Sequence, residues 1–138
     1  MRLIGIDYGT KRIGIAVSDA LGITVTPLTV IKRKTEAQDI EEIRKIVLEK
    51  EAERIVIGLP LNMNGTPGIL TGEIEAFAAK LKVATGVEID YCDERLTSHE
   101  AEGFLIHKAN MSREKRKEVK DKIAAYLILQ TYLEKNKP

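Results

Sequence analysis

Three acidic positions of this chain lie where a folded protein would not normally place a charge. The first is Asp7, which closes an apolar segment and is followed by a glycine turn that also holds Lys11 and Arg12. Ligands of open α/β sheets gather beyond the carboxyl ends of the strands, which is where Asp7 would lie. A carboxylate beside two cations predicts a metal ion that bridges it to a phosphate. The alternative is an aspartate that only caps the turn.

The second position is Asp121, at the head of the apolar stripe of a predicted C-terminal helix. At about 100° per residue, Ala125, Ile128 and Tyr132 fall within about 60° of it. This face must pack on a sheet, where an unpaired carboxylate would be costly or would take up a proton. We therefore expect Asp121 to be paired with a metal ion or with a buried arginine.

The third position is the pair Asp93 and Glu94, directly after a predicted strand. Side chains alternate across a strand, so one of the two should share a face with Asp7. Glutamate has the longer side chain, and Gly58 at the end of the neighbouring predicted strand leaves room for it. This favours Glu94 and leaves Asp93 open.

Together these carboxylates predict a site for Mg²⁺ or Mn²⁺, because hard divalent cations prefer oxygen ligands. Such a site suits hydrolysis of phosphodiester bonds, in which one or two ions bind the phosphate and activate water. Lys11, Arg12 and Arg95 would bind phosphates and position a nucleic acid. Serine or cysteine nucleophiles, P-loops and dinucleotide motifs find no support in the sequence.

The elements that would position these residues follow from the hydrophobic pattern. Residues 2–7, 13–18 and 23–32 predict three strands in an antiparallel meander. The remaining predicted elements are a helix from the N-cap Thr35 to Glu51, strands over 54–59 and 87–92, and helices over 70–84, 98–107 and 113–135, the last capped by Ser112. Right-handed crossovers then give an RNase H-like α/β domain over 1–138, a mixed five-stranded sheet with helices on both faces.

Composition sets the broad class of the protein. The 138 residues suit one domain, and a single cysteine excludes an internal disulfide bond. No signal-like segment and no run of about 20 apolar residues is found, so we expect a cytoplasmic protein. The net charge is only +1, but cations gather between His107 and Lys122. This cluster indicates either a phosphate-binding surface or a solvated helix face.

Four blocks of the sequence, in the same order, closely resemble the YqgF/RuvX family of bacterial proteins. The blocks are 5–16 (GIDYGTKRIGIA), 58–66 (GLPLNMNGT), 93–98 (DERLTS) and 121–125 (DKIAA) with 128–130 (ILQ). Members are described as Holliday-junction-resolvase-like and as pre-16S rRNA nucleases. The resemblance implies an RNase H-like fold, an acidic cluster of Asp7, Glu94 and Asp121, and a role in maturing the 5′ end of 16S ribosomal RNA. Family patterns often have aspartate at residue 64 and threonine at residue 98, and neither departure touches these carboxylates.

Several alternatives remain open from the sequence. A resolvase of branched DNA would have to be a homodimer to cut two strands symmetrically, whereas an RNA nuclease could be a monomer. A nucleic-acid-binding factor that does not cut, acting in transcription or ribosome assembly, would have no use for carboxylates beside phosphates. One lobe of a sugar kinase or an actin-like ATPase opens with a similar motif, but the chain is too short for the second lobe. Since aromatic residues are only 4% of the chain, recognition by shape is favoured over base stacking.

Overall fold

The computed structural model describes residues 1–60, 68–93 and 112–136. Within them, five strands form one sheet in the order β3-β2-β1-β4-β5. The strands are β1 (Leu3–Tyr8), β2 (Arg12–Ser18), β3 (Val25–Lys32), β4 (Arg54–Leu59) and β5 (Glu88–Asp93). The first three form the predicted antiparallel meander, and β4 and β5 run parallel to β1.

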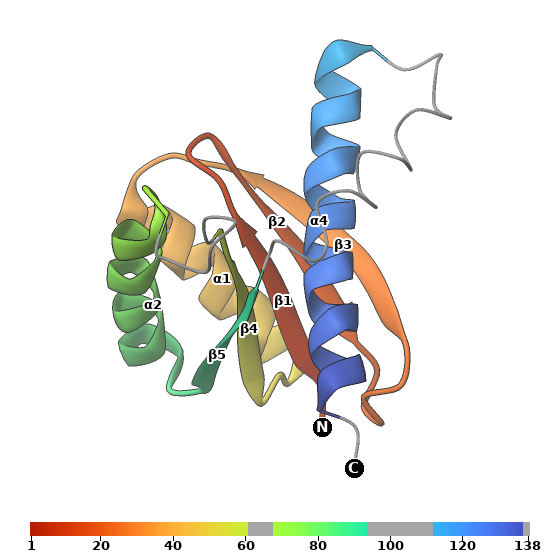
Figure 1. Cartoon of the computed structure of the whole chain (residues 1–138). Coiled ribbons are helices and arrows are strands. Elements are labelled where there is room, and N and C mark those ends of the chain that lie inside the picture. The colour runs from red at the N-terminus through yellow and green to blue at the C-terminus, as the bar shows by residue number, and fades with distance from the viewer. Residues whose placement is uncertain (61–67, 94–111, 137–138) are drawn as a thin grey trace.

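Helices cover both faces of the sheet, as predicted (Figure 1). The two helices α1 (Glu36–Lys50) and α2 (Thr71–Thr85) lie on one face, and the long helix α4 (Arg113–Lys135) lies on the other. The mixed sheet and its helices confirm the expected fold class. The helix predicted over 98–107 falls outside the described residues. In the part of the chain that is described, no helix is long and apolar enough to cross a membrane.

Local sequence signals define the helix ends. Thr35 caps α1 in a capping box with Gln38, in which each side chain receives the other residue's backbone N–H. Ser112 accepts a hydrogen bond from the backbone N–H of Lys115 and so caps α4. Gly86 ends α2 with a φ of 73°, a left-handed conformation that glycine adopts without strain. The two predicted caps, Thr35 and Ser112, are thereby confirmed.

The strand β1 divides its side chains between two hydrophobic cores. Ile4, Ile6 and Tyr8 belong to the larger core, under α1 and α2. Leu3 belongs to the smaller core, which α4 covers. Since side chains alternate along a strand, Asp7 points to the side of α4.

The helix α4 lies unusually close to the sheet because glycines face it. A β-carbon added at Gly5 would lie 2.8 Å from the β-carbon of Leu129 and 3.0 Å from the carbonyl oxygen of Ala125. Both distances are shorter than van der Waals contact, so a side chain at residue 5 would push the helix away. Glycine on the strand, together with alanine on the helix, permits this packing.

Candidate active site

Asp7 and Asp121 lie next to each other on the α4 side of the sheet. Asp7 pairs with Gly14 across the antiparallel ladder of β1 and β2, so both residues face the same side. A β-carbon added at Gly14 would lie 2.0 Å from the carbonyl oxygen of Asp121 and 3.3 Å from its β-carbon. The structure therefore places the backbones of Asp7 and Asp121, two of the three acidic residues that the sequence singled out, beside Gly14 on one face of the sheet, near the carboxyl end of β1.

The carboxylate of Asp121 contacts an arginine. Nε of Arg12 donates to Oδ2 of Asp121 over 2.6 Å, with side chains that are 24% and 19% exposed. Arg12 stands two residues before Gly14 on β2, so it faces the same side of the sheet. The sequence predicted that a metal ion or a buried arginine pairs with Asp121. The structure shows an arginine partner, Arg12, which the sequence alone did not identify. Strand alternation, which places Arg12 and Gly14 on one face, was the available signal.

Of the two candidates for the third carboxylate, the described residues include only Asp93. Asp93 is the last residue of β5, and the preceding Cys92 is buried in the core under α4. Alternation then places Asp93 on the opposite face, with Ile89, away from Asp7. Glu94 and Arg95 lie outside the described residues. Within residues 1–60, 68–93 and 112–136, no cluster of three histidine, cysteine or acidic side chains is found.

The family follows from comparison with known proteins. Residues 1–135 match the family model described as RuvX, Holliday junction resolvase. The chain belongs to the RuvX family. A protein of Thermoanaerobacter pseudethanolicus, named "Putative pre-16S rRNA nuclease", is 49% identical over 137 residues and 99% of each chain. A protein of Endomicrobium trichonymphae with the same name is 47% identical and covers 96% of this chain and 95% of its own.

The fold of this RuvX-family chain is also found among solved structures. The structure titled "T. thermophilus RuvC in complex with Holliday junction substrate" superposes with a TM-score of 0.61 and covers 99% of this chain and 97% of its own. At 13% sequence identity this likeness shows the RNase H-like fold alone. Family membership makes the chain a nuclease of the RuvX type, an enzyme that hydrolyses phosphodiester bonds.

The turn between β1 and β2 of this RuvX-family chain carries Lys11, which the sequence predicts to bind phosphate together with Arg12 and Arg95. The side chain of Lys11 is exposed, while its carbonyl oxygen accepts the backbone N–H of Arg33 over 3.0 Å. Nη1 of Arg33 also donates to the carbonyl oxygen of Gly9 over 3.1 Å. Two carbonyl groups of the turn are therefore held from the side of α1, and Lys11 extends into solvent.

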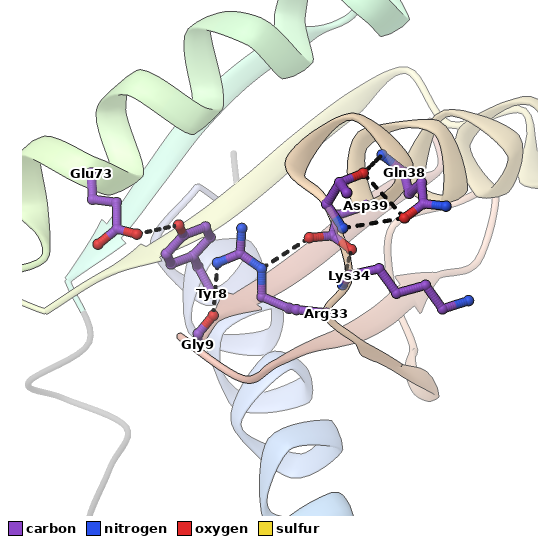
Figure 2. A network of polar contacts seen from close by, with 8 residues as sticks. Tyr8, Gly9, Arg33, Lys34, Gln38, Asp39 and Glu73 are labelled. Carbon is purple, nitrogen blue, oxygen red and sulfur yellow. Dashed lines mark hydrogen bonds and ion pairs between the residues drawn. The ribbon is translucent and has the colours of Figure 1, made fainter.

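Arg33 itself is fixed by a network that the sequence did not predict (Figure 2). Its Nε donates to Oδ2 of Asp39 over 3.0 Å, and its guanidinium lies 4.6 Å from the ring centre of Tyr8. Tyr8 in turn donates to Glu73 on α2 over 2.9 Å. The network therefore joins both helices of this face to the residue that follows Asp7.

Burial and charge shift the pKa values within this network. Burial raises the pKa of Tyr8, so its hydroxyl stays protonated and donates at neutral pH. Burial opposes the charge of Arg33, but its hydrogen bonds to Tyr8 and Asp39 prevail and raise the pKa of the guanidinium. The turn is thus held by a permanently charged group, independent of pH in the physiological range.

Proposed function

We propose that this nuclease depends on a divalent metal ion, Mg²⁺ or Mn²⁺, held by Asp7 and Asp121 together with Glu94. The observation that carries this proposal is the Asp7–Gly14 pair, because Gly14 brings the backbone of Asp121 onto the strand position beside Asp7. Carboxylate oxygens are the ligands that hard divalent cations prefer. The bound metal would supply charge stabilisation at the phosphate and a water of lowered pKa.

The choice of Glu94 over Asp93 is also a proposal, and strand alternation supports it. Asp93 lies on the side of α1 and α2, whereas Asp7 and Asp121 lie on the side of α4. Asp93 therefore faces away from the other two carboxylates, which leaves Glu94 as the acid of this pair that would complete the site.

We further propose that the substrate is the precursor of 16S ribosomal RNA, cut near its 5′ end in the cytoplasm. The names of the relatives from Thermoanaerobacter pseudethanolicus and Endomicrobium trichonymphae support this substrate. Lys11 projects from the turn beside Asp7 and, with Arg12 and Arg95, would bind phosphates of the RNA on either side of the cut.

Cleavage of a labelled 5′-leader RNA of precursor 16S rRNA tests the metal and the substrate together. The expected result is cutting with Mg²⁺ or Mn²⁺, none with EDTA, and loss in Asp7→Asn and Glu94→Gln while RNA binding persists. Asp93→Asn is the matched control, because it removes a neighbouring carboxylate from the opposite face. Equal loss of binding and cutting in Asp7→Asn, or full activity in EDTA, contradicts the proposal.

Holliday junction resolution is the second candidate, favoured by the description of the matching family model. Two symmetric cuts require two active sites, so this activity predicts a homodimer. Size-exclusion chromatography with a branched DNA substrate separates the two candidates. A dimer that cuts the junction, with no cut in the leader RNA, would favour the resolvase.

A further inference from the structure

The carboxylate that we assign to the metal is already occupied by a positive charge from the same chain. Nε of Arg12 lies 2.6 Å from Oδ2 of Asp121, a short charge-assisted hydrogen bond. Both side chains are more than three-quarters covered, so solvent screens the pair less than an ion pair at the surface. The nearby Glu118, one turn earlier on α4, lies 3.8 Å from Lys32 instead.

We propose that Arg12 is an exchangeable counter-ion of Asp121, which a divalent cation displaces when it binds. The inference rests on the proposed metal site and adds how that site is kept charged and accessible before the metal arrives. In the metal-free protein, the positive charge of Arg12 offsets the cost of partly burying the Asp121 carboxylate.

Exchange follows from the geometry of the shared oxygen. A divalent cation held by the Asp121 carboxylate would compete with Arg12 for Oδ2, to which Nε of Arg12 donates over 2.6 Å. Two cations that share one oxygen repel each other, so the guanidinium would swing away. Its stem is anchored on β2, opposite Lys32 of β3, and its side chain is partly exposed, so it has a route to solvent. A substrate phosphate bound beside the metal is an anion that the released guanidinium can bind.

Binding of Mn²⁺ to the whole protein, measured by titration calorimetry or by the EPR signal of the free ion, tests the exchange directly. We expect Arg12→Gln to bind Mn²⁺ about three- to tenfold more tightly than wild type, because the competitor is gone. Lys11→Gln is the matched control: it removes one positive charge from the preceding residue, whose side chain is exposed and forms no ion pair with the described residues. A change below about twofold is expected there, since an exposed charge is screened.

Three outcomes separate this inference from the proposed function. Tighter binding in Arg12→Gln than in Lys11→Gln supports the exchange. Equal or weaker binding in Arg12→Gln overturns it and leaves the metal site standing. If the wild-type protein binds no Mn²⁺, or if its Mn²⁺ binding is unchanged in Asp7→Asn, the proposed metal site is wrong. The exchange is then wrong with it.

Thermal unfolding provides a second readout that does not depend on catalysis. Without metal, Arg12→Gln should unfold at a lower temperature than wild type, because Asp121 has lost its partner. Saturating Mn²⁺ should then raise its Tm more than that of wild type, since a ligand stabilises in proportion to the logarithm of its concentration over Kd. Arg12→Lys, which keeps the charge, should lie between wild type and Arg12→Gln in both measurements. If Mn²⁺ raises the Tm of Arg12→Gln no more than that of wild type, the exchange is contradicted.

Discussion

Gly14 lies so close to the backbone of Asp121 that a β-carbon at residue 14 would be 2.0 Å from the Asp121 carbonyl oxygen. Together with the close approach of Gly5 to Ala125 and Leu129, this contact sets how closely α4 packs on β1 and β2. It also places the backbone of Asp121 beside Gly14, the ladder partner of Asp7. The packing of α4 and the proposed metal site therefore both require glycine at residue 14.

Gly14→Ala should lower both stability and cleavage. The methyl group cannot fit against a backbone carbonyl, so α4 must shift, and we expect a loss of about 1–3 kcal/mol in the free energy of unfolding. Urea unfolding followed by circular dichroism measures it. Gly72→Ala on α2 is the control, because nothing lies within 4 Å of a β-carbon there, and its stability should not fall. Equal losses in the two variants would refute the packing argument.

Breaking the ion pair of Arg33 with Asp39 should be costly, since the side chains are only 14% and 1% exposed. Arg33→Met leaves a buried carboxylate without its charge partner, for which we expect a loss of about 3 kcal/mol in stability. Arg44→Met removes a surface partner of Glu41 and should cost much less stability than Arg33→Met, because solvent screens an exposed ion pair. Chemical denaturation of both variants gives the comparison, and similar losses would contradict the assignment of Arg33 as the buried anchor of the turn.

Much of the fold could be predicted because it depends on local patterns. The strands followed from runs such as 54–59, where four consecutive residues are buried, and the helices from apolar residues at helical spacing after the caps Thr35 and Ser112. The face of α4 on which Asp121 lies could be predicted in the same way. The apolar stripe below it, with Ala125 and Ile128, is fully buried against the sheet.

What the sequence did not reveal depends on contacts between distant residues. Arg12 and Asp121 are separated by 109 positions, and only the packing of α4 on β2 shows that they meet. Arg33 is the buried partner of Asp39 and holds the carbonyl group of Gly9, and sequence spacing shows neither contact. The close packing of α4 on Gly5 and Gly14 depends on the register of the strands, which the sequence does not show.

The ion pair of Asp90 with Arg54 predicts a pH dependence of stability. A hydrogen bond from Tyr132, followed by the charge of Arg54, lowers the pKa of Asp90 below its ordinary value. A lowered folded-state pKa adds stability above the unfolded-state pKa of about 3.9, and this stability is lost as the pH falls through the folded-state value. Asp90→Asn should therefore be less stable than wild type at pH 7, and the difference should shrink below about pH 4. Urea unfolding across this range measures it, and a constant difference would contradict the assignment.

The first turns of α4 carry a stripe of cations that we expect to bind the RNA backbone. Arg113, Lys117 and Lys120 recur at helical spacing, are all exposed, and precede Asp121 on the same helix. Figure 1 shows these turns projecting past the strands, where a nucleic acid at the carboxylates could lie along them. Phosphate contacts of this kind set affinity and its salt dependence, with little effect on which sequence is bound.

The double variant Lys117→Gln/Lys120→Gln should weaken binding of the leader RNA and flatten its dependence on salt. Each lost phosphate contact to single-stranded RNA should reduce the slope of log K against log salt by about 0.7, so two contacts should remove about 1.4. Fluorescence anisotropy at several salt concentrations measures the slope. Lys45→Gln is the control, because Lys45 is exposed on α1, across the sheet from Asp121, and the slope should not change. An unchanged slope in the double variant would show that these lysines form a solvated face, and that the RNA leaves the carboxylates along another path.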